Sequence, residues 1–109
     1  MEIQKKIRVG VSGHDLKFWL PLQHALEATG RYEFRHDLWR GHDDHDPAQS
    51  DALIARADVL IAEWALGNAV YYSRHKRSGQ RLYVRFHAQE LRTEYPMRLD
   101  YEGVDSLIF

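Results

Sequence analysis

Histidine, tryptophan, carboxylate and amide side chains recur at four places in this sequence, each after a short run of apolar residues. The candidate site residues are Gly13, His14, Trp39, His42, His45, Glu63, Trp64, Asn68, His87, Gln89 and Glu90. Imidazole and carboxylate groups transfer protons near neutral pH, and indole rings stack on the apolar faces of ligands such as sugars. The set therefore favours a ligand-binding cleft, with a solvated rim of loops as the alternative interpretation.

One of these places also suggests a metal site. His42 and His45 are three residues apart in the run Gly41-His42-Asp43-Asp44-His45-Asp46, and imidazoles beside carboxylates coordinate transition metals. A loop imposes no fixed ligand spacing, however, and no distant further ligand is indicated. The alternative is a loop whose Asp46 caps a helix and whose histidines line the cleft or face water. We therefore expect no metal.

The phosphate-binding fingerprints of nucleotide-binding proteins do not occur in the chain. Gly10-x-x-Gly13 is not the G-x-G-x-x-G of dinucleotide binders, and no G-x-x-x-x-G-K-[ST] loop is present. Ser12 does not stand in the complete G-x-S-x-G pattern of a nucleophile elbow. A cleft without a phosphate loop suits a sugar or a lipid-linked acceptor better than a nucleotide.

Composition excludes several classes of protein. The 109 residues carry a net charge of -1, so no nucleic-acid partner is expected, because such proteins show a clear basic excess. There is no cysteine, which permits a cytoplasmic location and excludes disulfides. Neither a signal peptide nor a membrane span is expected. The basic cluster Arg74-His75-Lys76-Arg77 matches the dipole of a helix end, with contact to anionic lipid head groups as the alternative.

The elements that must position the candidate residues follow from hydrophobic periodicity. It predicts strands over residues 7–12, 32–39, 58–64, 81–87 and 105–109, and helices over residues 15–29, 47–56 and 67–78. Asp46 followed by Pro47 is typical of a capped helix start. The strand at 58–64 is the most apolar, which predicts a central strand buried on both faces.

Alternating strands and helices predict an α/β fold, a Rossmann-like three-layer sandwich around a five-stranded parallel sheet with strand order 3-2-1-4-5. Ligands bind such sheets beyond the carboxyl ends of the strands, which is where the candidate residues fall. The chain ends on the apolar strand at 104–109 without a covering helix. We therefore expect a sheet truncated after its fifth strand, in the opening part of a larger enzyme. A frayed strand in a small complete domain, or a homodimer through the uncovered sheet face, are the alternatives.

Three segments of the chain carry a family resemblance. They are ADVLIAEWALGNAV (residues 57–70), DLWRGHDDHD (37–46) and RFHAQEL (85–91), the last followed by Tyr95-Pro96. Together they resemble bacterial glycosyltransferase family 4 (glycosyl transferase group 1), whose members have the two-domain GT-B architecture. The EW-LGNA run is the most distinctive of the three.

The resemblance implies that residues 1–109 form the N-terminal, acceptor-side domain of such an enzyme, and that a C-terminal donor-binding domain is missing. The missing domain would hold most of the nucleotide-sugar, which is a co-substrate, so no cofactor is expected. His87 corresponds to the catalytic histidine that points at the donor sugar in many relatives. Gly13 lies in the loop that approaches the donor phosphates, but His14 stands where relatives have a second glycine.

The function expected from this resemblance is transfer of a sugar to a saccharide or lipid-linked acceptor, at the cytoplasmic side and with peripheral contact to the inner face of the membrane. The isolated chain is expected to be inactive. The alternative function is a non-catalytic, flavodoxin-like ligand-binding module.

Overall fold

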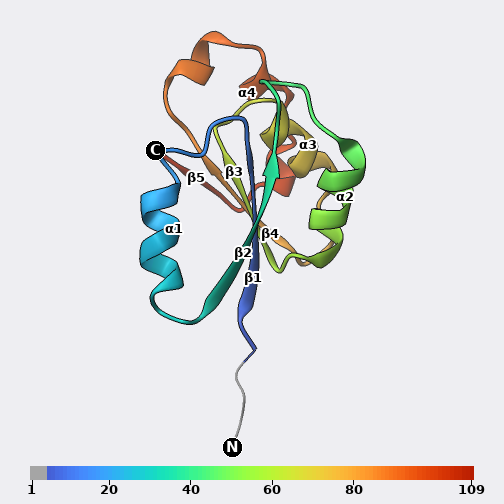
Figure 1. Ribbon diagram of the computed structural model, residues 1–109. Coiled ribbons are helices and arrows are strands. Elements are labelled where there is room, and N and C mark those ends of the chain that lie inside the picture. The colour runs from blue at the N-terminus through green and yellow to red at the C-terminus, as the bar shows by residue number, and fades with distance from the viewer. Residues whose placement is uncertain (1–4) are drawn as a thin grey trace, which may run out of the picture.

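The computed structural model describes residues 5–109 as a five-stranded sheet with helices on both faces (Figure 1). The strands are β1 (Ile7–Gly13), β2 (Tyr32–Leu38), β3 (Val59–Glu63), β4 (Arg81–Arg85) and β5 (Ser106–Ile108). The helices are α1 (Leu20–Glu27), α2 (Pro47–Arg56), α3 (Gly67–His75) and α4 (Tyr95–Arg98), with short 3-10 turns η1 (Gln89–Arg92) and η2 (Tyr101–Gly103). The predicted α/β sandwich with a parallel sheet is confirmed.

The predicted strand order is wrong. The sheet runs β2-β1-β3-β4-β5, so β3 rather than β4 lies beside β1, and β2 forms an edge. The reason lies in the side chains of these two strands. Glu33 and Arg35 of β2 are exposed, as suits an edge, whereas four of the five residues of β3 are buried. A strand that is apolar on both faces gains most burial at the centre, where helices cover it on both sides. The prediction that residues 58–64 form a central strand is therefore confirmed.

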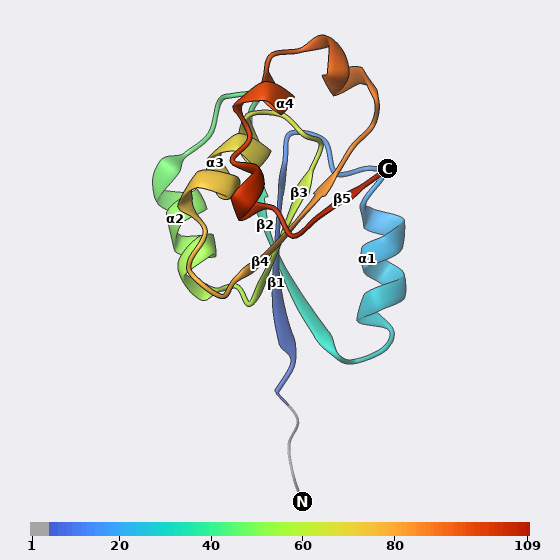
Figure 2. The ribbon, with the colours of Figure 1, turned by 180° about the vertical axis from the view of Figure 1, so that it is seen from behind.

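The helices divide between the two faces of the sheet. Figures 1 and 2 show α1 alone on one face and α2 with α3 on the other. Under α2 and α3 lies the larger core, centred on Leu60, Leu82 and Tyr72. On the other face α1 packs through Trp19, and an open apolar groove of about 280 Å³ remains beside it.

Local sequence accounts for where the helices begin. The side chain of Asp46 accepts a hydrogen bond from the backbone nitrogen of Ala48 at 3.0 Å, and Pro47 follows as the first helical residue, so the predicted cap of α2 is confirmed. Pro21 stands in the first turn of α1, where its missing N–H costs nothing. Helix α1 therefore begins at Leu20, later than the predicted residue 15.

No helix was predicted between the strands at 81–87 and 105–109, and this prediction is wrong for the connection from β4 to β5. It contains η1 and α4, which pass over the carboxyl edge of the sheet, and η2, which lies against α3 just before β5 (Figures 1 and 2). Two contacts with α3 anchor it. The backbone nitrogen of Asp100 donates to Ser73 Oγ at 3.0 Å, and Gly103 lies so close to the Ser73 carbonyl oxygen that a Cβ there would collide with it.

Candidate functional site

The carboxyl edge of the sheet carries a cleft of about 380 Å³. It lies where the connections from β1 and β3 diverge, since β1 leads to β2 on one side and β3 leads to β4 on the other. This is the position at which open parallel sheets bind their ligands. The cleft is lined by His14, Asp15, Lys17, Phe18, His42, Trp64, Leu66, Gln89, Glu90 and Thr93.

Glu63, the last residue of β3, is a fully buried carboxylate beside this cleft. Its Oε2 accepts a hydrogen bond from Arg85 Nη1 at 2.6 Å, and its Oε1 lies 2.5 Å from His87 Nε2. A buried carboxylate is costly unless it is paired and hydrogen-bonded, and here both oxygens have partners. An ionised carboxylate only accepts hydrogen bonds, so with Glu63 in that form the hydrogen of this bond belongs to Nε2 of His87.

His87 is therefore oriented like the histidine of a carboxylate–histidine dyad. In the neutral ring Nδ1 carries a lone pair, and it has no hydrogen-bond partner among residues 5–109. The side chain is 19% exposed. Two aromatic rings enclose it, with Trp64 stacked at 4.0 Å between centroids and Phe18 at 5.7 Å. Such a group can accept a proton from a ligand while Glu63 stabilises the charge it acquires.

Trp64 occupies a strained backbone conformation at the wall of the cleft. Its φ is 74°, in the left-handed region that non-glycine residues rarely adopt. The indole nitrogen donates to the carbonyl oxygen of Asp15 at 3.0 Å, which fixes the ring across the opening of the β1 loop. Strain of this kind costs about 1–3 kcal/mol and collects at ligand sites, where the surrounding structure enforces it.

Glu90 joins the loop after β3 to the loop after β4. This buried carboxylate, in η1, accepts hydrogen bonds from the backbone nitrogens of Ala65 and His87, each at 2.9 Å. Ala88, just before η1, has a φ of 70°. Ala88 and Trp64 are the two non-glycine residues with a left-handed backbone among residues 5–109. Trp64 directly follows β3, and Ala88 lies in the loop after β4. Glu90 holds these two loops in place.

Asn68 and Gly13 hold together the strand ends that form the floor of the cleft. The Asn68 amide donates to the carbonyl oxygens of Ser12 and Glu63, each at 3.0 Å, and so ties the end of β1 to the end of β3. A Cβ at Gly13 would lie 2.9 Å from the Glu63 carbonyl oxygen, so a larger residue would separate these strands. Neither residue is among those that line the cleft; their role is to hold its floor.

His14 and His42 meet at the mouth of the cleft. Their ring centroids are 4.9 Å apart in an edge-to-face arrangement. Burial, and then the neighbouring His42, lower the pKa of His14, so its imidazole is neutral at pH 7. Among residues 5–109 no three histidine, aspartate or glutamate side chains gather as a metal-binding group.

Trp39 and His45, also predicted as site residues, lie elsewhere. Trp39 is 4% exposed and stacks on His45 at 3.8 Å between centroids, on the face that α2 and α3 cover. Both belong to a network around Asp37 (the Asp37 cluster). Asp37 Oδ2 accepts hydrogen bonds from Trp39 Nε1, Ser50 Oγ and Tyr72 OH, and His45 Nδ1 lies 2.7 Å from Ser50 Oγ. This cluster fastens β2 to the helices behind it.

Several residues of the cleft were not predicted from the sequence. They are Asp15, Lys17, Phe18, Leu66 and Thr93, together with Arg85 behind the wall. Phe18 carried a usable signal, because a helix starting near Pro21 leaves it in the preceding loop, at the carboxyl edge. Arg85 is two residues from His87 along an extended strand, so the two side chains share a face.

Comparisons of the chain with protein-family models, with curated proteins and with solved structures find no match. No helix among residues 5–109 is both long and apolar enough to cross a bilayer.

Proposed function

We propose that the cleft binds a saccharide, and that the chain is the acceptor-side part of a glycosyltransferase that uses a nucleotide-sugar donor. The observation that carries this is the Glu63–His87 dyad, with its free Nδ1, beside the strained Trp64. Sugars present apolar ring faces and many hydroxyl groups. The Trp64 indole, two imidazoles and the Gln89 amide line the cleft and supply complementary surfaces, and His87 stacks on Trp64 beside it.

The absence of phosphate-binding features at β1 supports the acceptor side rather than the donor side. The loop after β1 contributes His14 and the acidic Asp15 to the cleft, where a nucleotide-binding loop would present glycine backbone nitrogens. Asp15 is paired with Lys17 of the same loop, so the loop adds no net charge to the cleft, and its carboxylate can accept hydrogen bonds from hydroxyl groups. In this proposal the nucleotide-sugar and its phosphates are held mainly by a second domain.

His87 has a defined role in the proposed transfer. Its Nδ1 accepts the proton of an acceptor hydroxyl group as the oxygen of that group bonds to the anomeric carbon of the donor. The bond from this carbon to the phosphate oxygen breaks, and the nucleotide leaves. Glu63 stabilises the imidazolium that forms, as the acidic member of other histidine dyads does.

Two experiments test this proposal. Tryptophan fluorescence of the chain is titrated with a panel of mono- and disaccharides, since Trp64 lines the cleft whereas Trp19 and Trp39 are buried. Saturable quenching that disappears in Trp64→Phe is expected. Transfer is then assayed on the protein as the cell produces it, where His87→Ala should lower kcat by at least about 100-fold. His24→Ala, an exposed histidine of α1, is the matched control. Full activity of His87→Ala would remove His87 from the mechanism.

A second candidate function is a non-catalytic binding module. The strand order β2-β1-β3-β4-β5 favours it, because flavodoxin-like domains that bind ligands without a second domain have this order. It predicts that the saccharide is bound by the chain and released unchanged, and that His87→Ala alters affinity alone. Turnover by the complete protein decides between the two.

A further inference from the structure

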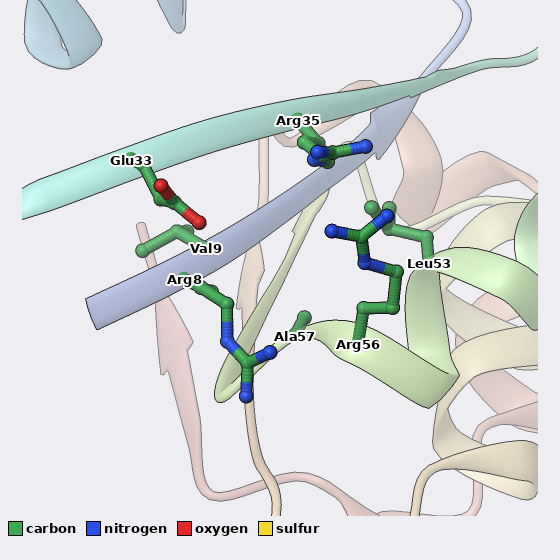
Figure 3. Close-up of a pocket in the computed structure, with 7 residues that line it drawn as sticks. All are labelled: Arg8, Val9, Glu33, Arg35, Leu53, Arg56 and Ala57. Atoms are coloured by element: carbon green, nitrogen blue, oxygen red, sulfur yellow. The ribbon is translucent and has the colours of Figure 1, made fainter. Parts of the chain in front are cut away.

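A groove separate from the cleft lies between the edge strand β2 and helix α2. Figure 3 shows Arg35, from β2, and Arg56, from the last turn of α2, extending their guanidinium groups toward the same space beside Leu53. The part of the groove along the edge of the sheet has a volume of about 230 Å³. Leu53 can pack closely on β1 because position 10 is glycine, and this brings α2 and its arginine near the strand.

Neither guanidinium has an acidic partner among residues 5–109. Arg8 is paired with Asp58 and Arg40 with Asp44, whereas Arg31 and several further arginines also have no acidic partner among the described residues. What distinguishes Arg35 and Arg56 is that both line one groove. Arg56 suits the end of a helix by its charge alone, but Arg35 comes from a different element and adds a like charge next to it. Two cations directed into one groove repel each other unless an anion lies between them.

The chemistry of the groove selects the anion. Guanidinium groups bind phosphate and carboxylate through paired N–H donors, and an arginine pair holds a tetrahedral phosphate from two sides. Gln49 adds an amide, and no carboxylate lines the part of the groove along the edge of the sheet. Glu33 lies at the other end, beside Arg8 and Val9 (Figure 3). Ala52 and Leu53 give an apolar floor for the organic part of a ligand.

We propose that Arg35 and Arg56 form a binding site for a phosphoryl group in this groove. The ligand class is a phosphomonoester or the phosphate of a lipid head group, held by the two guanidiniums with its organic part on Ala52 and Leu53. The site lies on the α2 face of the sheet, away from the cleft at the carboxyl edge, and it does not depend on the proposed transfer reaction.

The test is an NMR titration of the chain with inorganic phosphate at constant ionic strength. Saturable shifts are expected for the backbone amides of Gln49, Leu53, Arg56 and the neighbouring residues of β2. Arg35→Gln and Arg56→Gln should each raise Kd about tenfold, the loss of a charge-assisted hydrogen bond. Arg31→Gln, which removes an exposed arginine just before the same strand, is the control and should leave Kd unchanged.

Two further arms identify the source of the phosphate. Glycerol 3-phosphate probes soluble phosphomonoesters, and flotation with phosphatidylglycerol vesicles, compared with phosphatidylcholine vesicles, probes a lipid surface. Binding in either arm that is lost in Arg35→Gln and Arg56→Gln supports the site and names its ligand. Shifts that do not saturate, or that weaken equally in all three variants, would overturn the proposal. Thermal unfolding of each variant verifies that it is folded.

Discussion

Two buried carboxylates flank β1 at the same edge of the sheet, and they have different surroundings. Glu63, at the end of β3, is bonded to a cationic arginine and to a histidine that remains partly exposed beside the cleft. Asp37, near the end of β2, is bonded to the neutral donors Trp39, Ser50 and Tyr72 and is enclosed by α2 and α3. Asp37 is level with Ser12 of β1 and Glu63 lies one residue further along β3, so the two side chains point to opposite faces of the sheet. One carboxylate thus supports the candidate site and the other the packing of the fold.

The two carboxylates differ in whether their hydrogen-bond partners are exposed to solvent. Arg85 and His87 are 20% and 19% exposed, so the partners of Glu63 can contact a ligand. Tyr72 is fully buried, and burial together with the charge of Asp37 raises its pKa far above the usual range, so it remains a hydrogen-bond donor. A buried acid becomes a candidate functional group when its partners reach the surface.

The largest effect on stability is expected for Asp37→Ala. Three buried donors would lose their common acceptor at once, and the free energy of unfolding should fall by about 3–5 kcal/mol. Urea denaturation measures this loss. Because a loss of this size is enough to unfold a small domain, Tyr72→Phe is measured alongside it and should cost about 1 kcal/mol. Asp44→Ala, at an exposed ion pair, should change stability by less than about 0.5 kcal/mol.

Glu63→Ala should cost less, about 1–3 kcal/mol, because Arg85 and His87 can turn toward water. It should nevertheless abolish the quenching of Trp64 by saccharide, because His87 would lose its orientation. Urea denaturation and the fluorescence titration give both readouts on one sample. A loss of stability equal to that of Asp37→Ala, with ligand binding intact, would erase the distinction between the two carboxylates.

A smaller effect tests the strain at the cleft. Trp64→Gly and Trp64→Ala both remove the indole, but only glycine adopts a φ of 74° without steric cost. Trp64→Gly should therefore be the more stable of the two by about 1 kcal/mol. At Ala57, where φ is -77°, glycine should instead be destabilising. If alanine were more stable than glycine at position 64, as it should be at position 57, Trp64 would not be strained.

The smallest effect concerns pH. Since the pKa of His14 is lowered in the folded chain, the unfolded chain binds a proton more readily, and stability is lost as pH falls below the ordinary value of about 6.5. His14→Gln should reduce this loss. Burial also lowers the pKa of His36, so His36→Gln should act in the same direction. Urea midpoints compared between pH 7.5 and pH 5 measure both effects. If both variants lost as much stability on acidification as the unchanged protein, His14 and His36 would not be its source.

The sequence predicted the elements of the fold better than their arrangement. Hydrophobic periodicity located the strands, and Asp46-Pro47 located the start of α2, because both signals act within a few residues. Strand order depends on which side of β1 each following strand is placed, and no local sequence pattern determines this. The exposed Glu33 and Arg35 of β2 were nevertheless evidence for an edge strand, and they argue against the predicted order.

The candidate site shows the same limit. His14, His42, Trp64, Gln89 and Glu90 line the cleft because the carboxyl ends of parallel strands share one edge. Trp39 and His45 follow β2 along the same edge, but Asp37 and the helices behind it draw them inward. The left-handed backbone of Trp64 could not be read from its residue type, since tryptophan rarely adopts it.

The connection from β4 to β5 has a consequence for motion. Its three short helical segments have few buried residues, and β5 pairs with β4 over three residues, so this part should open by local unfolding more readily than the central strands. Amide hydrogen exchange should therefore be fastest there. Gln89, Glu90 and Thr93 belong to this segment, so one wall of the cleft is built on the part of the fold that we expect to open most readily, opposite the ends of β1 and β3.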